Sequence, residues 1–171
     1  MGSLGPANAC DVQEDNIYDV IARHDVIFEA VYLGAEPYRE HRSLLEWAQL
    51  SHYEPPAFEH PDQYLRCRRT YRVVSTWKGE VSGVVESLSA NFFNIPEDCY
   101  QAREIGDRFL VLAFRDDNEQ IIGDSSPGIS TYMCDPMSYL WPEDYRVVLS
   151  KTYPWSDAAE RYALDSGTTA R

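Results

Sequence analysis

The side chains best suited to chemistry are two histidines and two glutamates in one short segment. They are His52, Glu54, Glu59 and His60. Imidazole and carboxylate groups this close together are typical of a metal site or of acid–base catalysis. However, Pro55, Pro56 and Pro61 interrupt the same segment, as is typical of a solvated loop. We favour the loop, and we predict that the protein has no metal of its own and no cofactor.

Known catalytic motifs do not occur. The sequence contains no GxSxG, no HExxH and no glycine-rich phosphate loop. Ser125 and Ser126 precede a Pro-Gly pair and have no obvious base, so we assign them to a turn. Residues 116–118, Asp-Asp-Asn, fit a hairpin turn better than a calcium site, which would need more oxygen ligands. We therefore predict that the protein is not an enzyme.

Four cysteines indicate the redox environment. They are Cys10, Cys67, Cys99 and Cys134, and none forms a CxxC pair or a close Cys/His pair of the zinc-site kind. Two disulfides, or one disulfide with free thiols, fit this spacing better than a metal site does. Disulfides favour an oxidising compartment, so we predict a secreted or periplasmic protein. Four buried thiols in the cytosol are the alternative.

Composition restricts the classes of partner. In 171 residues, 44% are hydrophobic and 25% charged, which is typical of one globular domain. Acidic residues number 28 against 15 basic, a net charge of −13, so a phosphate backbone would be repelled and we predict no nucleic-acid partner. The apolar runs are too short for a membrane span.

The basic residues include a cluster in one predicted strand. It consists of Arg66, Arg68, Arg69 and Arg72. Arg66, Arg68 and Arg72 have the same parity and share one strand face. A solvated strand face explains them most simply, and an acidic partner is the alternative.

The first part of the chain predicts one helix and one strand ahead of a long insertion. Residues 14–24 carry apolar side chains at helical spacing, and His24 at the end would place a favourable charge at the helix C-terminus. Residues 25–34 are rich in β-branched and aromatic side chains and end at glycine, which predicts a strand. Residues 36–64 contain four prolines around a short helical pattern and form a surface insertion.

The remaining elements are shorter and mostly strands. Strands are predicted over residues 65–77, 81–88, 108–114, 120–123 and 129–134. Helices are predicted behind Pro142 and after Ser156. Because closure removes exposed edges, this pattern predicts a mainly β fold, a small closed antiparallel barrel with flanking helices.

The order of several short motifs resembles the netrin-like fold. They are Asp25-Val26-Ile27-Phe28, Tyr71-Arg72-Val73, Trp77-Lys78-Gly79, Cys99 ahead of Gly106-Asp107-Arg108-Phe109-Leu110-Val111, and the late Cys134. The chain is most similar to the tissue inhibitors of metalloproteinases (TIMP-like) and their bacterial relatives, over about Cys10 to Leu140. The resemblance implies a five-stranded OB-type barrel. We expect a leader or signal remnant at 1–9, a netrin-like domain at 10–141 and a helical extension at 142–171 that packs on the barrel.

The resemblance also implies a function and a site. In these inhibitors the amino group and carbonyl oxygen of an N-terminal cysteine chelate the zinc of a target protease. Transferred to this chain, the inhibitory wedge would be Cys10, Asp11 and Val12 beside Pro96, Glu97, Asp98, Cys99 and Tyr100. A disulfide from Cys10 to Cys99 would hold it together. Cys67, which has no family counterpart, would then be left to pair with Cys134.

The functional prediction is therefore a secreted protein-binding domain, in its sharpest form a metalloprotease inhibitor. The chain has Val12 where the inhibitors have a second cysteine, Asp11 would bring a charge into an apolar specificity pocket, and residues 1–9 would convert the amine of Cys10 into an amide. The alternative is accordingly a non-inhibitory adhesion or scaffold module. Aromatic residues could supply its recognition surface, unless they pack on the barrel instead. They are Trp47, Tyr53, Phe58, Trp141 and Trp155.

Overall fold

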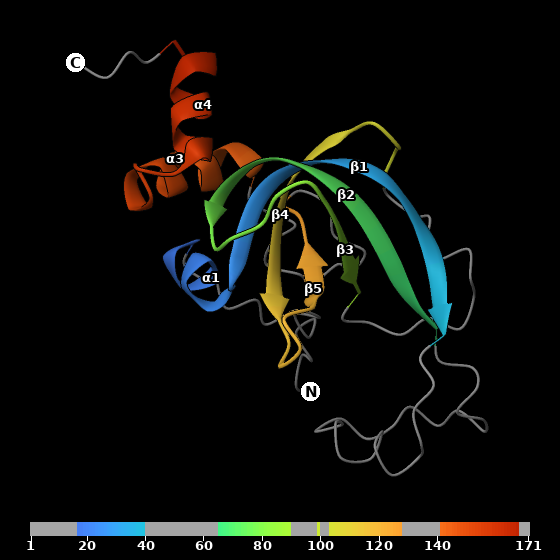
Figure 1. The fold of residues 1–171 in the computed structure, drawn as a ribbon. Helices are drawn as coiled ribbons and strands as arrows, with labels where there is room; N and C mark the ends of the chain where they lie inside the picture. Colours follow the sequence, from blue (N-terminus) through green and yellow to red (C-terminus); the bar gives the residue numbers. More distant parts are fainter. Residues whose placement is uncertain (1–16, 40–64, 90–98, 100–102, 128–140, 168–171) are drawn as a thin grey trace, which may run out of the picture.

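The computed structural model describes residues 17–39, 65–89, 99, 103–127 and 141–167. Its helices are α1 (Ile17–Arg23), α3 (Pro142–Thr152) and α4 (Asp157–Asp165), and its strands are β1 (Val26–Arg39), β2 (Leu65–Lys78), β3 (Val84–Leu88), β4 (Arg108–Arg115) and β5 (Ile121–Ser125) (Figure 1). These bounds confirm the predicted elements, except that the strand predicted at 129–134 lies outside the described residues. Among the described helices, none has the length and apolar character needed to cross a membrane.

The strands close into one barrel in the order β1-β2-β3-β5-β4. Every neighbouring pair is antiparallel except β3 and β5, which run parallel through the pairs Ser87–Ile121 and Leu88–Ile122. The mainly β, OB-type barrel with flanking helices and a long insertion after β1 is therefore confirmed. The parallel β3–β5 pair is the one exception to the predicted antiparallel arrangement. An odd number of strands cannot alternate in direction all the way round a closed ring, so one pair must be parallel.

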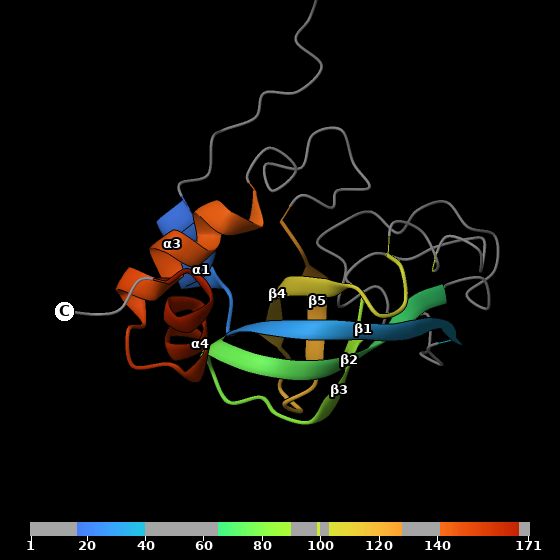
Figure 2. The same ribbon diagram turned by 90° about the horizontal axis from the view of Figure 1, so that it is seen from above.

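Both faces of the barrel wall are buried near β1 and β4. Inside the barrel, Phe28 and Tyr32 of β1 pack with Tyr71 and Val111. On the outer face, Ile27, Trp77, Leu110 and Leu112 pack against side chains of the helices. The helix residues are Val20, Ile21, Tyr145, Leu149, Ala158 and Ala159. Figure 2 shows the three helices together on one side of the barrel. Burial of these apolar surfaces fixes the helices on the strands and gives that side a defined shape.

The pairing of β1 with β2 has three register shifts, one of them between Ile27 and Phe28, and these shifts change which side chains face the helices. The pairing shifts between Tyr32 and Gly34, and Gly34 has a φ of 145°. The glycine predicted to end the strand instead lies within it, and β1 continues to Arg39. A further shift places an extra β2 residue between the partners of Glu29 and Ala30. Since one extra residue reverses the parity of a strand, Ser75 and Trp77 lie on the helix side.

The end of α1 corrects the role predicted for His24. This side chain is buried, its Nδ1 lies 2.7 Å from the carbonyl oxygen of Val20, and its ring stacks on Phe114. Burial lowers the pKa of His24 below its usual 6.5, so the imidazole is neutral at pH 7. Lys78 places a positive charge at this helix end, because its Nζ donates to backbone carbonyl oxygens 2.5–3.0 Å away. They belong to Ile21, Ala22 and His24.

Candidate functional site

Most residues of the predicted inhibitory wedge lie outside the described residues. They are Cys10, Asp11, Val12, Pro96, Glu97, Asp98 and Tyr100. The cluster at 52–60 and the aromatic residues Trp47, Tyr53 and Phe58 also lie outside them. Cys99 is the one member of the wedge that the structure describes.

Cys99 is bonded to Cys67, with an S–S distance of 2.06 Å and a Cα–Cα distance of 5.2 Å. The predicted pairings of Cys10 with Cys99 and of Cys67 with Cys134 were therefore wrong. Cys67 shares the inward side of β2 with Tyr71, and both cysteines are buried, with exposures of 0% and 2%. The family pairing left Cys67 without a counterpart, yet its position in the strand brings it within bonding distance of Cys99.

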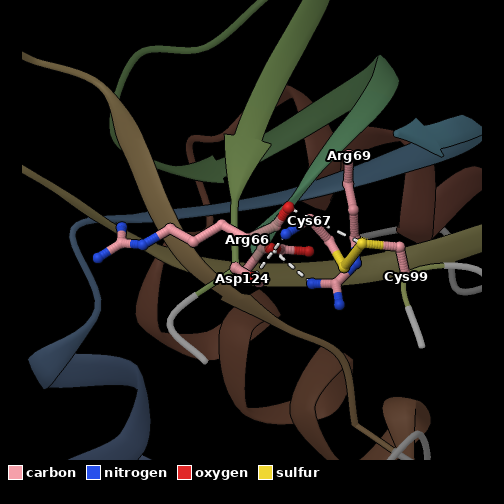
Figure 3. The surroundings of a disulfide bond; sticks show 6 residues. Arg66, Cys67, Arg69, Cys99 and Asp124 are labelled. Atoms are coloured by element: carbon pink, nitrogen blue, oxygen red, sulfur yellow. Dashed lines mark hydrogen bonds and ion pairs between the residues drawn. A yellow bond between two sulfur atoms is a disulfide. The ribbon is translucent and has the colours of Figure 1, made fainter. Parts of the chain in front are cut away.

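A buried polar cluster lies beside this disulfide (Figure 3). At its centre is Asp124 of β5, whose carboxylate has an exposure of 0%. Oδ1 accepts hydrogen bonds from Arg69 at 2.9 Å and Ser87 at 3.0 Å. Oδ2 accepts from Tyr71 at 2.5 Å and Arg103 at 2.9 Å. The guanidinium group of Arg103 also donates to the Tyr71 hydroxyl. The cluster thus joins β2, β3, β5 and the segment before β4.

The charges in this cluster decide which groups stay ionised. Burial alone would raise the pKa of Asp124, but Arg69 and Arg103 outweigh it and lower the pKa to about 2. Burial and the adjacent carboxylate raise the pKa of Tyr71 well above 10.0, so its hydroxyl remains protonated. Since every group around Asp124 has a partner, the cluster is structural.

The same contacts account for much of the arginine cluster of β2. Arg69 faces inward to Asp124, while Arg68 lies 3.2 Å from Glu36 and 3.8 Å from Glu86. The guanidinium group of Arg68 also stacks 4.1 Å from the ring centroid of Tyr38. Figure 3 shows the side chain of Arg66 directed away from the disulfide. Of the four arginines, Arg69 is therefore part of the buried cluster, Arg68 is paired with acidic side chains and Arg72 is exposed.

Two tryptophans of the helical side are exposed rather than packed on the barrel. Trp141 lies at the start of α3 and is 71% exposed, and Trp155 lies between α3 and α4 and is 80% exposed. The first turn of α3 holds Trp141, whose backbone N–H donates to Asp144 at 3.1 Å. Trp155 contacts Tyr153 edge to face, with ring centroids 6.3 Å apart. Both aromatic side chains are therefore presented to solvent from ordered helix ends.

Between α3, α4 and the outer face of the barrel lies a polar pocket of about 420 Å³. Glu29 and Trp77 lie at its floor, both almost completely buried. Glu29 accepts two hydrogen bonds from Arg146, at 2.7 and 3.0 Å, and one from the Trp77 indole at 3.3 Å. These hydrogen bonds raise the pKa of Arg146. The fork-shaped ion pair ties α3 to β1 and fills the floor with matched charges.

The wall of the pocket holds charged side chains of α4 and β4. Tyr162 donates to Glu143 at 2.6 Å. Arg108, Arg161 and Asp165 are exposed, and within the described chain their side chains make no hydrogen bond or ion pair. Sequence reasoning missed this site because it needs the β2 bulge, which brings Trp77 to the helix side. Elsewhere in the described residues, no group of histidine, cysteine or acidic side chains is arranged to hold a metal.

No protein-family model matches the chain, and no curated protein matches it significantly. The netrin-like resemblance therefore stays a prediction that rests on the motifs alone.

Proposed function

We propose that this chain is a protein-binding module of an oxidising compartment, secreted or periplasmic, which acts by binding rather than catalysis. The observation that carries the proposal is the exposure of Trp141 and Trp155, at 71% and 80%. Tryptophan is among the residues that contribute most to protein–protein affinity, and it is costly to leave in water. The buried Cys67–Cys99 bond supports the choice of compartment, because such bonds are rare in the cytosol.

The proposed contact surface is the outer side of α3 with the two tryptophans at its ends. Tyr145 and Leu149 face the core, and Val147 lies two residues from each, so it points outward and is 39% exposed. A partner that covers Trp141, Val147 and Trp155 would bury three apolar side chains that folding leaves in solvent. We therefore place the partner on α3, away from the polar cluster at Asp124.

Metalloprotease inhibition is the sharper form of this proposal, and the cysteine pairing favours the non-inhibitory form instead. A Cys10–Cys99 bond was to hold the chelating terminus beside residues 96–100, but Cys99 is bonded to Cys67. Without that clamp, the ordering of the terminus would have to come at the expense of binding free energy. We expect a chain that begins at Cys10 to leave zinc metalloproteases active. Inhibition that is abolished by acetylation of the Cys10 amine would restore the inhibitor form.

Photo-crosslinking tests the proposed surface. A photoreactive phenylalanine analogue is placed at position 155. As a control, the same analogue replaces Glu160, an exposed polar residue of α4. The extracytoplasmic fraction of the native host is then irradiated with each protein. We expect one protein to be crosslinked from position 155 and not from position 160.

The crosslinked protein is then purified and titrated with folded variants. Trp141→Ala and Trp155→Ala should each weaken binding at least about thirtyfold, as hot-spot residues do. Asn118→Ala, at an exposed site in the turn between β4 and β5, should change it less than about threefold. Equal crosslinking from both positions, or an affinity that neither tryptophan affects, would overturn the proposal.

A further inference from the structure

The segment that carries the two exposed tryptophans has an excess of negative charge. Residues 141–167, which include α3 and α4, expose five acidic side chains and two basic ones. The acidic residues are Glu143, Asp144, Asp157, Glu160 and Asp165, and the basic residues are Lys151 and Arg161. The third basic residue of the segment, Arg146, is neutralised by the buried Glu29 of β1 at 2.7 Å. Outside that pair, the segment therefore has a net charge of −3.

Two of these carboxylates are fixed beside the tryptophans. Asp144 accepts a hydrogen bond from the backbone N–H of Trp141 at 3.1 Å. Asp157 follows Trp155 by two residues, and its Oδ1 accepts from the backbone N–H of Thr76 at 2.9 Å. Both donors are neutral backbone groups, so these hydrogen bonds hold the carboxylates in place without cancelling their charge. An approaching partner therefore meets negative charge next to each exposed indole.

We propose that the partner of the α3 contact surface is a protein of net positive charge, whose basic side chains surround an apolar contact for Trp141 and Trp155. This inference rests on the proposed function and adds the chemistry of the partner. Opposite charges attract the two proteins before they touch, which raises the rate of association. The buried tryptophans act after contact, so they determine mainly the rate of dissociation. Charge and apolar area thus have separate and measurable effects.

The charge of the whole chain argues against other occupants of this apolar surface. At a net charge of −13, two copies of the chain repel each other, which opposes self-association through α3. Tryptophan is also typical of membrane interfaces, but an anionic lipid surface would repel both the segment and the chain. Nucleic acid is repelled for the same reason. A basic protein is the macromolecule whose charge complements the local surface and the chain together.

The salt dependence of association tests the inference. The probe is the purified protein that crosslinks from position 155, and its association with the full chain is followed by stopped-flow fluorescence. We expect the association rate constant to fall at least about tenfold between about 0.02 and 0.5 M sodium chloride, because salt screens the attraction. The dissociation rate constant should change less than about threefold. An association rate that is independent of salt, or that rises with salt, would overturn the inference.

Glu160→Lys and Asp117→Lys are a matched pair of charge variants. Each replaces an exposed acidic side chain and changes the net charge by the same amount. Glu160 belongs to α4, above the barrel in Figure 1, and Asp117 to the turn between β4 and β5, below it. At about 0.1 M salt, where the Debye length is about 10 Å, Glu160→Lys should lower the association rate constant at least about threefold and Asp117→Lys less than about 1.5-fold. Equal effects of the two variants would overturn the assignment of the attraction to this surface.

Two measurements on the chain alone test the other occupants. Sedimentation should show a monomer, and flotation with phosphatidylcholine–phosphatidylserine vesicles should show no binding. Self-association or vesicle binding that Trp155→Ala abolishes would overturn the inference.

Failure of this inference is distinguishable from failure of the proposed function. If Trp141→Ala and Trp155→Ala weaken binding but neither salt nor Glu160→Lys changes the association rate, the contact surface stands and the basic partner is excluded. If no protein crosslinks from position 155, the contact surface fails and this inference fails with it.

Discussion

The hydroxyl of Tyr71 donates a 2.5 Å hydrogen bond to Asp124, which joins the middle of β2 to β5 inside the barrel. The same carboxylate forms ion pairs with Arg69 and Arg103, both at 2.9 Å. Removal of one partner from a buried ion pair leaves an uncompensated charge, which costs about 3–5 kcal/mol. We expect Asp124→Asn to lower the free energy of unfolding by about that amount, measured by urea denaturation.

The stability of the fold at low pH should also depend on the Asp124 carboxylate. Its pKa is lowered from 3.8 to about 2, so its stabilising effect is complete above pH 3.8 and is lost as the pH falls towards 2. Asp124→Asn should remove that part of the acid sensitivity. Ser87→Ala is the control, because it removes one neutral donor to Asp124 and should cost only about 1 kcal/mol. A loss for Asp124→Asn no larger than that for Ser87→Ala would contradict the role of the charge.

The Cys67–Cys99 disulfide should contribute about 3–4 kcal/mol to stability, because it closes a loop with a sequence separation of 32. The double substitution Cys67→Ser and Cys99→Ser should lower the free energy of unfolding by that amount. Non-reducing peptide mapping should recover a peptide pair that contains these two cysteines. A bridge from Cys10 to Cys99 in the folded protein would contradict the structure and restore the clamp of the inhibitory wedge.

Protonation of His24 should destabilise the fold. Because burial lowers its pKa in the folded state, the unfolded chain binds more protons as the pH falls below about 6.5. Stability attributable to this residue is therefore complete above pH 6.5 and declines below it. Comparison of wild type with His24→Phe, which keeps an aromatic ring beside Phe114, isolates this residue. The variant should lose less stability than wild type between pH 7.5 and about 5, and parallel pH profiles would contradict the buried neutral imidazole.

Local patterns were sufficient to predict the elements of the barrel. The apolar alternation of residues 65–77 predicted β2 to within one residue. Pro142 ahead of an acidic first turn predicted the start of α3. The parallel β3–β5 pair could also have been anticipated, because it follows from closing five strands. The continuation of β1 past Gly34 was not predictable in this way, since a glycine that ends a strand and one within a bulge look alike in sequence.

The candidate sites depended on contacts that sequence spacing does not contain. Arg69 looked like part of a solvated cluster, but its partner Asp124 lies 55 residues away. Glu29 and Arg146 are separated by 117 residues and meet because helix α3 packs back on β1. Trp155 is exposed in the short connection between α3 and α4. From composition alone, this side chain could equally have packed on the barrel or formed part of a recognition surface. In each case long-range packing determines the environment, and a single sequence does not encode it in any local pattern.

Gly79 and Gly83 provide a matched pair of substitutions in the connection between β2 and β3. Both have positive φ angles, 74° and 71°, so alanine at either site pays the cost of a left-handed backbone, about 1–2 kcal/mol. A Cβ atom on Gly79 would also lie 2.7 Å from Val26 Cγ1 and 2.8 Å from the carbonyl oxygen of Asp25, whereas one on Gly83 would meet nothing within 4 Å. The β2 end must therefore move away from β1 in Gly79→Ala but not in Gly83→Ala.

We expect Gly83→Ala to lower the free energy of unfolding by about 1–2 kcal/mol and Gly79→Ala to lower it by at least about 1 kcal/mol more. Thermal and urea denaturation of both variants, with wild type alongside, measure the difference. Lys78 precedes Gly79 and holds the end of α1 through three carbonyl oxygens. Displacement of this turn should therefore also increase amide exchange at the end of α1 in Gly79→Ala alone. Equal losses in the two variants would show that backbone conformation, and not the close approach to Val26, requires glycine at this position.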